Sequence, residues 1–179
     1  MLSSPPVLDV IESLLDKSLL QQVDHGGEEP RVLMLETIRE YGLECLAAAG
    51  EMKQSQRAHT TYYIALAQRA EPELFHHQQE LWMGRLERDY ENIRASLNWL
   101  QEQHAQEQLM NLAGSLGWFW YMRGSLKEGQ YWLELALQSS PPNAFGPVRC
   151  RVLALAALLT ALLLGQRGLS IDPAESAWR

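Results

Sequence analysis

The chain has 179 residues, of which 46% are hydrophobic and 21% are charged, and its formal net charge is −7. This length and composition allow one large domain or two small ones with a packed core. The negative charge argues against broad non-specific DNA binding, because such binding depends on basic surface that neutralises phosphates.

The first part of the chain predicts a short helix followed by a β-hairpin. A helix is expected over residues 7–17, where Val, Ile and Leu recur at helical spacing. Two short apolar runs, at 19–23 and 32–35, flank the segment HGGEEP. Its Gly and Pro residues are typical of a turn that closes a hairpin.

A second helix is expected directly after the hairpin. Apolar residues from Ile38 to Leu46 recur at i, i+3, i+4, i+7 and i+8. Gly50 stands where the C-terminus of a helix favours a left-handed residue. Helix, hairpin and helix is the order of the wing portion of a winged-helix domain, so we expect a partial domain of this kind over residues 1–51.

Helices are expected to dominate the rest of the chain, residues 52–179. One should follow Gly50 and run to about Ala70, where Pro72 marks its exit. Another is expected as a single helix over 78–103. Its apolar stripe consists of Trp82, Leu86, Tyr90, Ile93, Leu97 and Leu100. We interpret this stripe as core rather than as a cofactor site.

A tetratricopeptide-like pattern follows, in which paired helices repeat with a period of 34 residues. With Met110 at position 1, the residues that match this pattern are Leu116, Gly117, Trp120, Gly124, Leu133, Ala136 and Pro141. We expect paired helices around 110–123 and 126–138, with Gly117 and Ala136 allowing their close approach. Gly129 replaces the usual alanine, which weakens the second helix by about 1 kcal/mol.

The last helical segment, VLALAALLTALLL at 152–164, is almost entirely apolar. It is about seven residues shorter than the ~20 needed to cross a bilayer, and arginines flank it. We therefore expect a buried helix of the solenoid and no membrane contact. The sequence after Gly168 lacks a partner helix of normal length, so the repeats are expected to be incomplete at the C-terminal end. One face should then stay exposed and cause self-association, which polar residues at Leu159 and Leu163 should relieve.

Several separated motifs resemble STAND-type signalling ATPases, which include bacterial AfsR- and LuxR-type regulators. They are DKSLL and RVLMLETIREYGLE, then RAHTTYYIALAQRAEPEL, LERDYENIRASLNWL and WFWYMRGSLKEGQYWLELAL. In that family a P-loop ATPase precedes a winged helix, and a helical repeat sensor follows it. The resemblance implies a mainly α fold, with a partial winged helix that carries a β-hairpin, followed by a tetratricopeptide-like α-solenoid.

The resemblance also bears on Met34, Leu35 and Glu36. In eukaryotic relatives a Met-His-Asp motif occupies this place, and its histidine contacts bound ADP. Leu35 stands where that histidine would be, so a side chain here cannot make the contact. We interpret Met34–Glu36 as a structural joint, in which Glu36 favours the start of the following helix because carboxylates stabilise helix N-termini.

Catalytic and ligand-binding motifs are absent from the sequence. It contains no GxxxxGK followed by Ser or Thr, no HExxH, no GxSxG and no CxxC. His76 and His77 are adjacent, and adjacent helical residues point about 100° apart, which does not suit joint metal ligation. We therefore expect no catalytic residues, no cofactor and no metal.

The two cysteines indicate the redox state of the cellular compartment. Cys45 and Cys150 share no motif and both lie in apolar helical contexts, so we expect two buried thiols in a reduced, cytoplasmic protein. The N-terminus lacks a basic region followed by an apolar core, so no secretion signal is visible.

Three functional classes follow, and we favour a non-catalytic interaction and sensor segment of a STAND-type signal-transduction ATPase or transcriptional regulator. Its helical repeats would bind a protein partner or effector. The alternative is a fragment of a DNA-binding winged-helix transcription factor. The strands offer mainly Lys17 and Arg31 to phosphates, and HGGEE carries two acids, so no direct nucleic-acid binding is expected. The third class, a free-standing enzyme, has no supporting residues.

Overall fold

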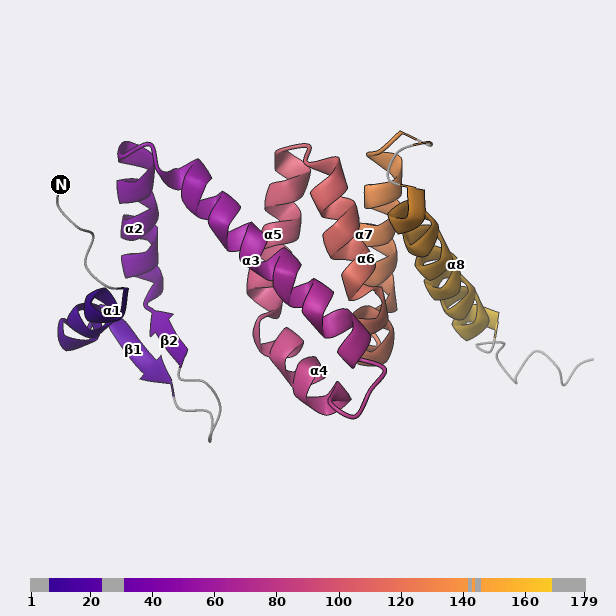
Figure 1. Ribbon diagram of the computed structural model, residues 1–179, viewed down its shortest axis with the longest axis horizontal. Helices are drawn as coiled ribbons and strands as arrows, with labels where there is room; N and C mark the ends of the chain where they lie inside the picture. The colour runs from indigo at the N-terminus through magenta and orange to yellow at the C-terminus, as the bar shows by residue number, and fades with distance from the viewer. Residues whose placement is uncertain (1–6, 24–30, 142, 144–145, 169–179) are drawn as a thin grey trace, which may run out of the picture. The chain divides into compact units, whose positions relative to one another are not determined.

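The computed structural model describes residues 7–23, 31–141, 143 and 146–168. In this described part, eight helices and one antiparallel β-hairpin follow one another along the chain (Figure 1). They form two compact units, Met1–Ser55 and Gln56–Arg179. The predicted fold class, mainly α with a hairpin followed by a series of helices, is confirmed.

The first unit has the predicted order of helix, hairpin and helix. Its elements are α1 (Val7–Asp16), β1 (Leu20–Val23), β2 (Arg31–Met34) and α2 (Glu36–Ala48). The strands pair antiparallel, with Leu20 opposite Met34 and Val23 opposite Arg31. The expected turn, HGGEEP, falls outside the described residues. Gly50 adopts a left-handed φ of 74° after α2, as predicted.

The described residues of the first unit bury very little apolar surface. Leu20 is the one buried hydrophobic residue among them, whereas Val7, Leu8, Leu33 and Tyr41 are mostly exposed. None of the residues of α2 is buried. Within its described part, this unit therefore has almost no core of its own.

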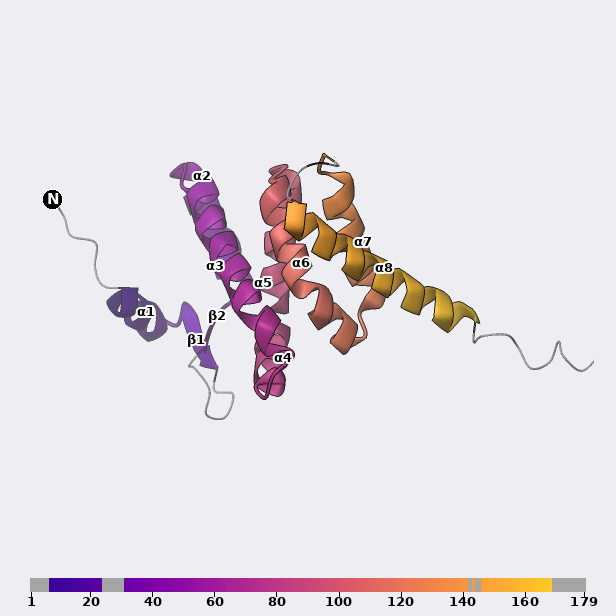
Figure 2. The same ribbon diagram turned by 45° about the vertical axis from the view of Figure 1, so that its right-hand side comes forward.

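The second unit is an array of helices around one hydrophobic core. It contains most of α3 (Met52–Glu73) and all of α4 (Gln79–Arg88), α5 (Tyr90–Glu102), α6 (Gln106–Arg123), α7 (Leu126–Gln138) and α8 (Gly146–Gly168). Helices α6, α7 and α8 pack against one another, and they lie side by side in both views (Figures 1 and 2). Pro72 lies in the last turn of α3, close to the predicted exit.

The helix predicted over 78–103 is two helices, α4 and α5, which meet at Asp89. The backbone of Asp89 has φ −94° and ψ 4°, far enough from helical values to turn the chain there. Aspartate is disfavoured in helix interiors and favoured at helix ends, which agrees with the position of the break. The apolar stripe is core as predicted: Leu86, Tyr90, Ile93, Leu97 and Leu100 are buried, and Trp82 is half-buried.

The expected burial of the two thiols is wrong, because Cys45 and Cys150 are both exposed. Cys45 lies on α2, none of whose residues is buried. Cys150 lies in the first turns of α8, two residues before the buried Val152. Helical periodicity correctly identified the apolar residues around each cysteine. It did not show which side of each helix faces the core.

The apolar C-terminal helix is longer than the apolar run suggested. Helix α8 has 23 residues, and Gly146–Gln166 is long and apolar enough to cross a membrane by length and composition alone. The helix is therefore long enough to span a bilayer, and the expected shortness of this segment is wrong. The absence of membrane contact stays a prediction, which the packing of α8 on α6 and α7 favours.

One face of α8 is buried and the other is exposed, although not at all the expected positions. Val152, Leu155 and Leu159 are buried, so Leu159 is not the exposed residue that the sequence suggested. Leu163, the other expected position, is half-buried and packs against the core. Leu153 and Leu164 are 48% and 60% exposed.

Candidate interaction surface

The predicted repeat residues lie around the junction of α6, α7 and α8. Leu116, Gly117, Trp120, Leu133 and Ala136 are buried, Gly124 is left-handed with φ 79°, and Pro141 is exposed beyond the end of α7. The N–H of Ser125 donates to the Trp120 carbonyl over 3.0 Å, which closes α6 as in a Schellman motif. The turn between α6 and α7 thus depends on Gly124, because a side chain is strained at this φ.

Side chains of α8 pack against glycines on α6 and α7. A Cβ at Gly117 would lie 2.5 Å from Leu155 Cδ1, and one at Gly129 would lie 2.8 Å from both Leu159 Cδ1 and Trp120 Cβ. Gly117 therefore faces α8, not α7 as the repeat pattern suggested. Gly129, which the repeat pattern identified only as a residue that weakens its helix, allows α6, α7 and α8 to approach one another closely.

A buried hydrogen bond joins α5 to α6. The indole Nε1 of Trp120 donates to the hydroxyl of Tyr90 over 2.6 Å, and the guanidinium of Arg123 lies 4.2 Å from the Tyr90 ring centroid. Burial raises the pKa of the Tyr90 phenol well above its usual value. The phenol therefore stays neutral and accepts the indole hydrogen bond across the physiological range.

An ion pair joins α8 to α3 beside the glycines. Arg151 Nη1 donates to both carboxylate oxygens of Glu71, over 2.8 and 2.9 Å. A Cβ at Gly114 would lie 3.2 Å from the other terminal nitrogen of Arg151, so the guanidinium lies directly over the backbone of α6.

Three aromatic side chains form a partly exposed cluster on the second unit, which we call the aromatic patch: Phe75, Trp118 and Tyr121. The rings of Phe75 and Trp118 meet edge to face at 5.0 Å, and those of Trp118 and Tyr121 at 5.3 Å. Phe75 is 53% exposed, Tyr121 is 41% exposed and Trp118 is half-buried. Aromatic residues are enriched at protein–protein interfaces. The repeat pattern does not predict this patch, because Phe75 lies outside the pattern.

The residues of the expected structural joint lie between β2 and α2. Met34 ends β2, Leu35 is extended with ψ 143°, and Glu36 begins α2. Arg39 Nε donates to Glu36 Oε2 over 2.9 Å, and this hydrogen bond lowers the pKa of the Glu36 carboxyl. All three residues of the joint are exposed, and the geometry is that of a short connection closed by a surface ion pair.

The described residues contain no group of three or more His, Cys, Asp or Glu side chains that could hold a metal ion. His76 and His77 lie in the exposed turns between α3 and α4. The absence of a metal, a cofactor and a catalytic site remains a prediction from the sequence.

Most of this chain is similar in sequence to one segment of longer proteins. No family model matches the sequence, and no solved structure matches it. One protein of Mycobacterium bovis and proteins of two strains of Mycobacterium tuberculosis are each 35% identical to the chain over 160 residues, or 88% of its length. Each bears the name "Putative HTH-type transcriptional regulator", and the match spans 18% of its length. The chain is thus similar, over most of its length, to about a fifth of these mycobacterial proteins.

Proposed function

We propose that the chain is a non-catalytic protein-interaction and sensor segment of a cytoplasmic, STAND-type transcriptional regulator. The name of the mycobacterial relatives supports the regulatory role. The resemblance of the motifs to STAND proteins supports the finer assignment, in which the helical array is the sensor. In this proposal α3 to α8 bind a protein partner or effector.

The observation that carries the proposal is the aromatic patch. Its rings are fixed by edge-to-face contacts, and burying such rings removes large apolar areas from water at little cost in side-chain entropy. The helix that carries Trp118 and Tyr121 is anchored on its other sides by the glycine contacts with α8 and the Trp120 hydrogen bond. A rigid, exposed aromatic surface of this kind suits binding of an apolar segment of a partner protein.

Site-specific photocrosslinking in cells tests this role. A photoreactive phenylalanine replaces Tyr121 in one variant and Tyr131 in another, because Tyr131 is also exposed, at 54%, but lies on α7 outside the patch. We expect a discrete crosslinked species from position 121 that is reduced when Phe75→Ala is added. Equal crosslinking from both positions, or none from position 121, would contradict the proposal.

The non-catalytic part of the proposal has a separate test. Because the sequence has no P-loop and carries Leu35 at the place of the phosphate-contacting histidine, we expect no tight binding of ATP or ADP. Isothermal titration with either nucleotide and magnesium should give no saturable heat in the micromolar range. Micromolar binding at one nucleotide per chain would overturn this part.

A second candidate is DNA binding by the first unit, which the name of the relatives favours. The described residues of this unit carry seven acidic and four basic side chains, and Arg39 is paired with Glu36. This balance is unfavourable for contact with phosphates. Fluorescence anisotropy with duplex DNA decides between the two: affinity that falls steeply with added salt would favour this candidate over ours.

A further inference from the structure

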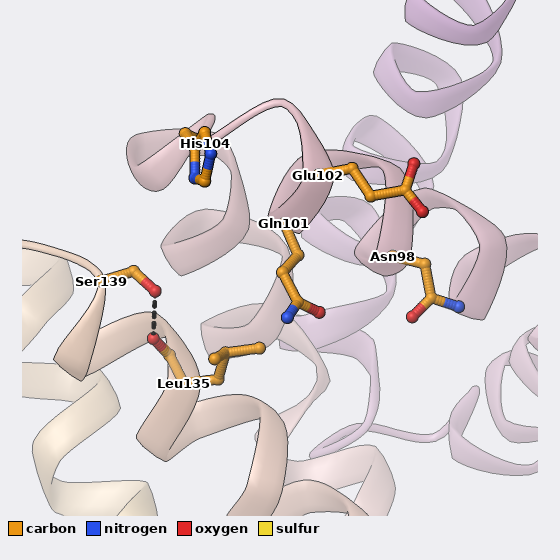
Figure 3. A pocket seen from close by; sticks show the side chains of 6 residues that line it. All are labelled: Asn98, Gln101, Glu102, His104, Leu135 and Ser139. Carbon is orange, nitrogen blue, oxygen red and sulfur yellow. Dashed lines mark hydrogen bonds between the residues drawn. The ribbon is translucent and has the colours of Figure 1, made fainter.

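A pocket of about 460 Å³, lined mostly by polar residues, opens between the C-terminal ends of α5 and α7 (Figure 3). It is lined by Asn98, Gln101, Glu102, His104, Leu135 and Ser139. Its volume lies within the range of small-molecule sites. None of these residues belongs to the aromatic patch, so the pocket is a separate feature of the second unit.

The polar side chains on the α5 side have free hydrogen-bonding capacity. In the described part of the chain, no hydrogen bond or ion pair involves the side chains of Asn98, Gln101 or Glu102. On the α7 side, by contrast, Ser139 Oγ already donates to the Leu135 carbonyl over 2.7 Å. Figure 3 shows Gln101 directed toward Leu135, with Asn98 and Glu102 on its other side. Two side-chain amides and one carboxylate therefore line the pocket together with one apolar side chain.

The electrostatics of the pocket favour a positive charge. Both α5 and α7 direct their C-terminal ends toward it, and helix C-termini carry partial negative charge. Arg149 donates to the Leu137 and Ser140 carbonyls and so compensates the end of α7. The last turn of α5 contains no basic residue, and the lining contains Glu102 but no Lys or Arg. No lysine or arginine side chain therefore offsets the partial negative charge at the end of α5.

The conformation of His104 supports a specialised role for this end of α5. His104 has φ 52°, a left-handed value at a position where helix ends favour glycine. Its N–H donates to the Gln101 carbonyl over 3.1 Å, and the next N–H, of Ala105, donates to the Leu100 carbonyl over 2.9 Å. A strained non-glycine residue at the edge of a pocket is a feature that recurs at binding sites.

We propose that this pocket binds an organic cation: a primary ammonium group on an alkyl chain, as in a diamine or a lysine side chain. The ammonium donates to the Asn98 and Gln101 amide oxygens and to the Glu102 carboxylate, and the alkyl chain packs on Leu135. An ammonium has three donors and no acceptor, so it matches the two amide oxygens and the carboxylate, which all accept. An anion is disfavoured by Glu102 and by the helix end.

Isothermal titration at low salt tests the proposal with four probes: 1,4-diaminobutane, N-acetyl-lysine amide, the neutral N-acetyl-norleucine amide and glutarate. We expect saturable binding of at least one of the two cations and none of the neutral or anionic probe. Binding of the diamine alone identifies a free amine as the ligand, and binding of the lysine amide alone identifies a peptide side chain. No saturable binding of either cation, or equal binding of the norleucine amide, would overturn the proposal.

Two matched variants locate the binding. Glu102→Gln removes the charge without changing the size, and we expect at least tenfold weaker binding, equivalent to about 1.4 kcal/mol. Glu107→Gln removes an exposed glutamate outside the lining, and binding should stay within twofold. Equal effects of the two substitutions would exclude this pocket as the site. Because patch and pocket share no residue, failure of cation binding and failure of crosslinking at Tyr121 are separate outcomes.

Discussion

Substitution of one glycine tests how closely α6, α7 and α8 pack. In a helix interior Gly→Ala ordinarily stabilises by about 1 kcal/mol. At Gly129 the added Cβ would lie 2.8 Å from both Leu159 Cδ1 and Trp120 Cβ. Trp120 cannot easily turn away, because its Cβ is next to the backbone and its indole is hydrogen-bonded to Tyr90. Overpacking of this kind costs roughly 1–3 kcal/mol, and we place Gly129→Ala at the upper end, for a net loss of about 2 kcal/mol.

Gly84→Ala is the matched control, since Gly84 lies inside α4 and an added Cβ there has no other atom within 4 Å. Thermal unfolding followed by circular dichroism at 222 nm should give a Tm lower by about 4–8 °C for Gly129→Ala. Gly84→Ala should raise Tm by about 2–4 °C. If Gly129→Ala also raised Tm, the described contact between the three helices would be refuted.

Three further predictions concern a helix end, a buried phenol and an exposed helix face. His104→Gly should raise the free energy of unfolding by about 1 kcal/mol, because a left-handed φ is unstrained for glycine, and a urea titration that gave no gain would contradict this. The raised pKa of Tyr90 means that, above pH ~10, the unfolded state loses a proton that the folded state retains. The free energy of unfolding should therefore fall by up to about 1.4 kcal/mol per pH unit above pH ~10. Measured at pH 10 and 11, it should fall less steeply in Tyr90→Phe than in the wild type. Polar residues at Leu153 and Leu164 should reduce self-association through α8, and light scattering that showed a monodisperse wild-type monomer at high concentration would refute it.

Periodicity and turn chemistry predicted most of the elements because both are local properties of the chain. The Gly50 and Gly124 helix ends are two such cases, with left-handed φ values of 74° and 79°. The break at Asp89 was missed because the apolar stripe keeps its spacing through the break, so no change in periodicity marks it.

The candidate surfaces depend on contacts between segments distant in the sequence, which periodicity does not reveal. Phe75 meets Trp118 across 43 positions, and the pocket joins the end of α5 to the end of α7. The exposure of Cys45 and the burial of Leu159 have the same cause, because neighbouring helices decide which side of an apolar helix is covered.

The affinity of the purified chain for the partner crosslinked at Tyr121 tests the central claim most directly. Truncating an aromatic residue at the centre of an interface typically costs 2 kcal/mol or more, so we expect Tyr121→Ala to weaken binding by at least about thirtyfold. Tyr131→Ala, which removes a tyrosine from α7 that is more exposed than Tyr121, should change the affinity by less than twofold. Equal losses in the two variants, or full affinity in Tyr121→Ala, would contradict the assignment of the aromatic patch as the partner-binding surface.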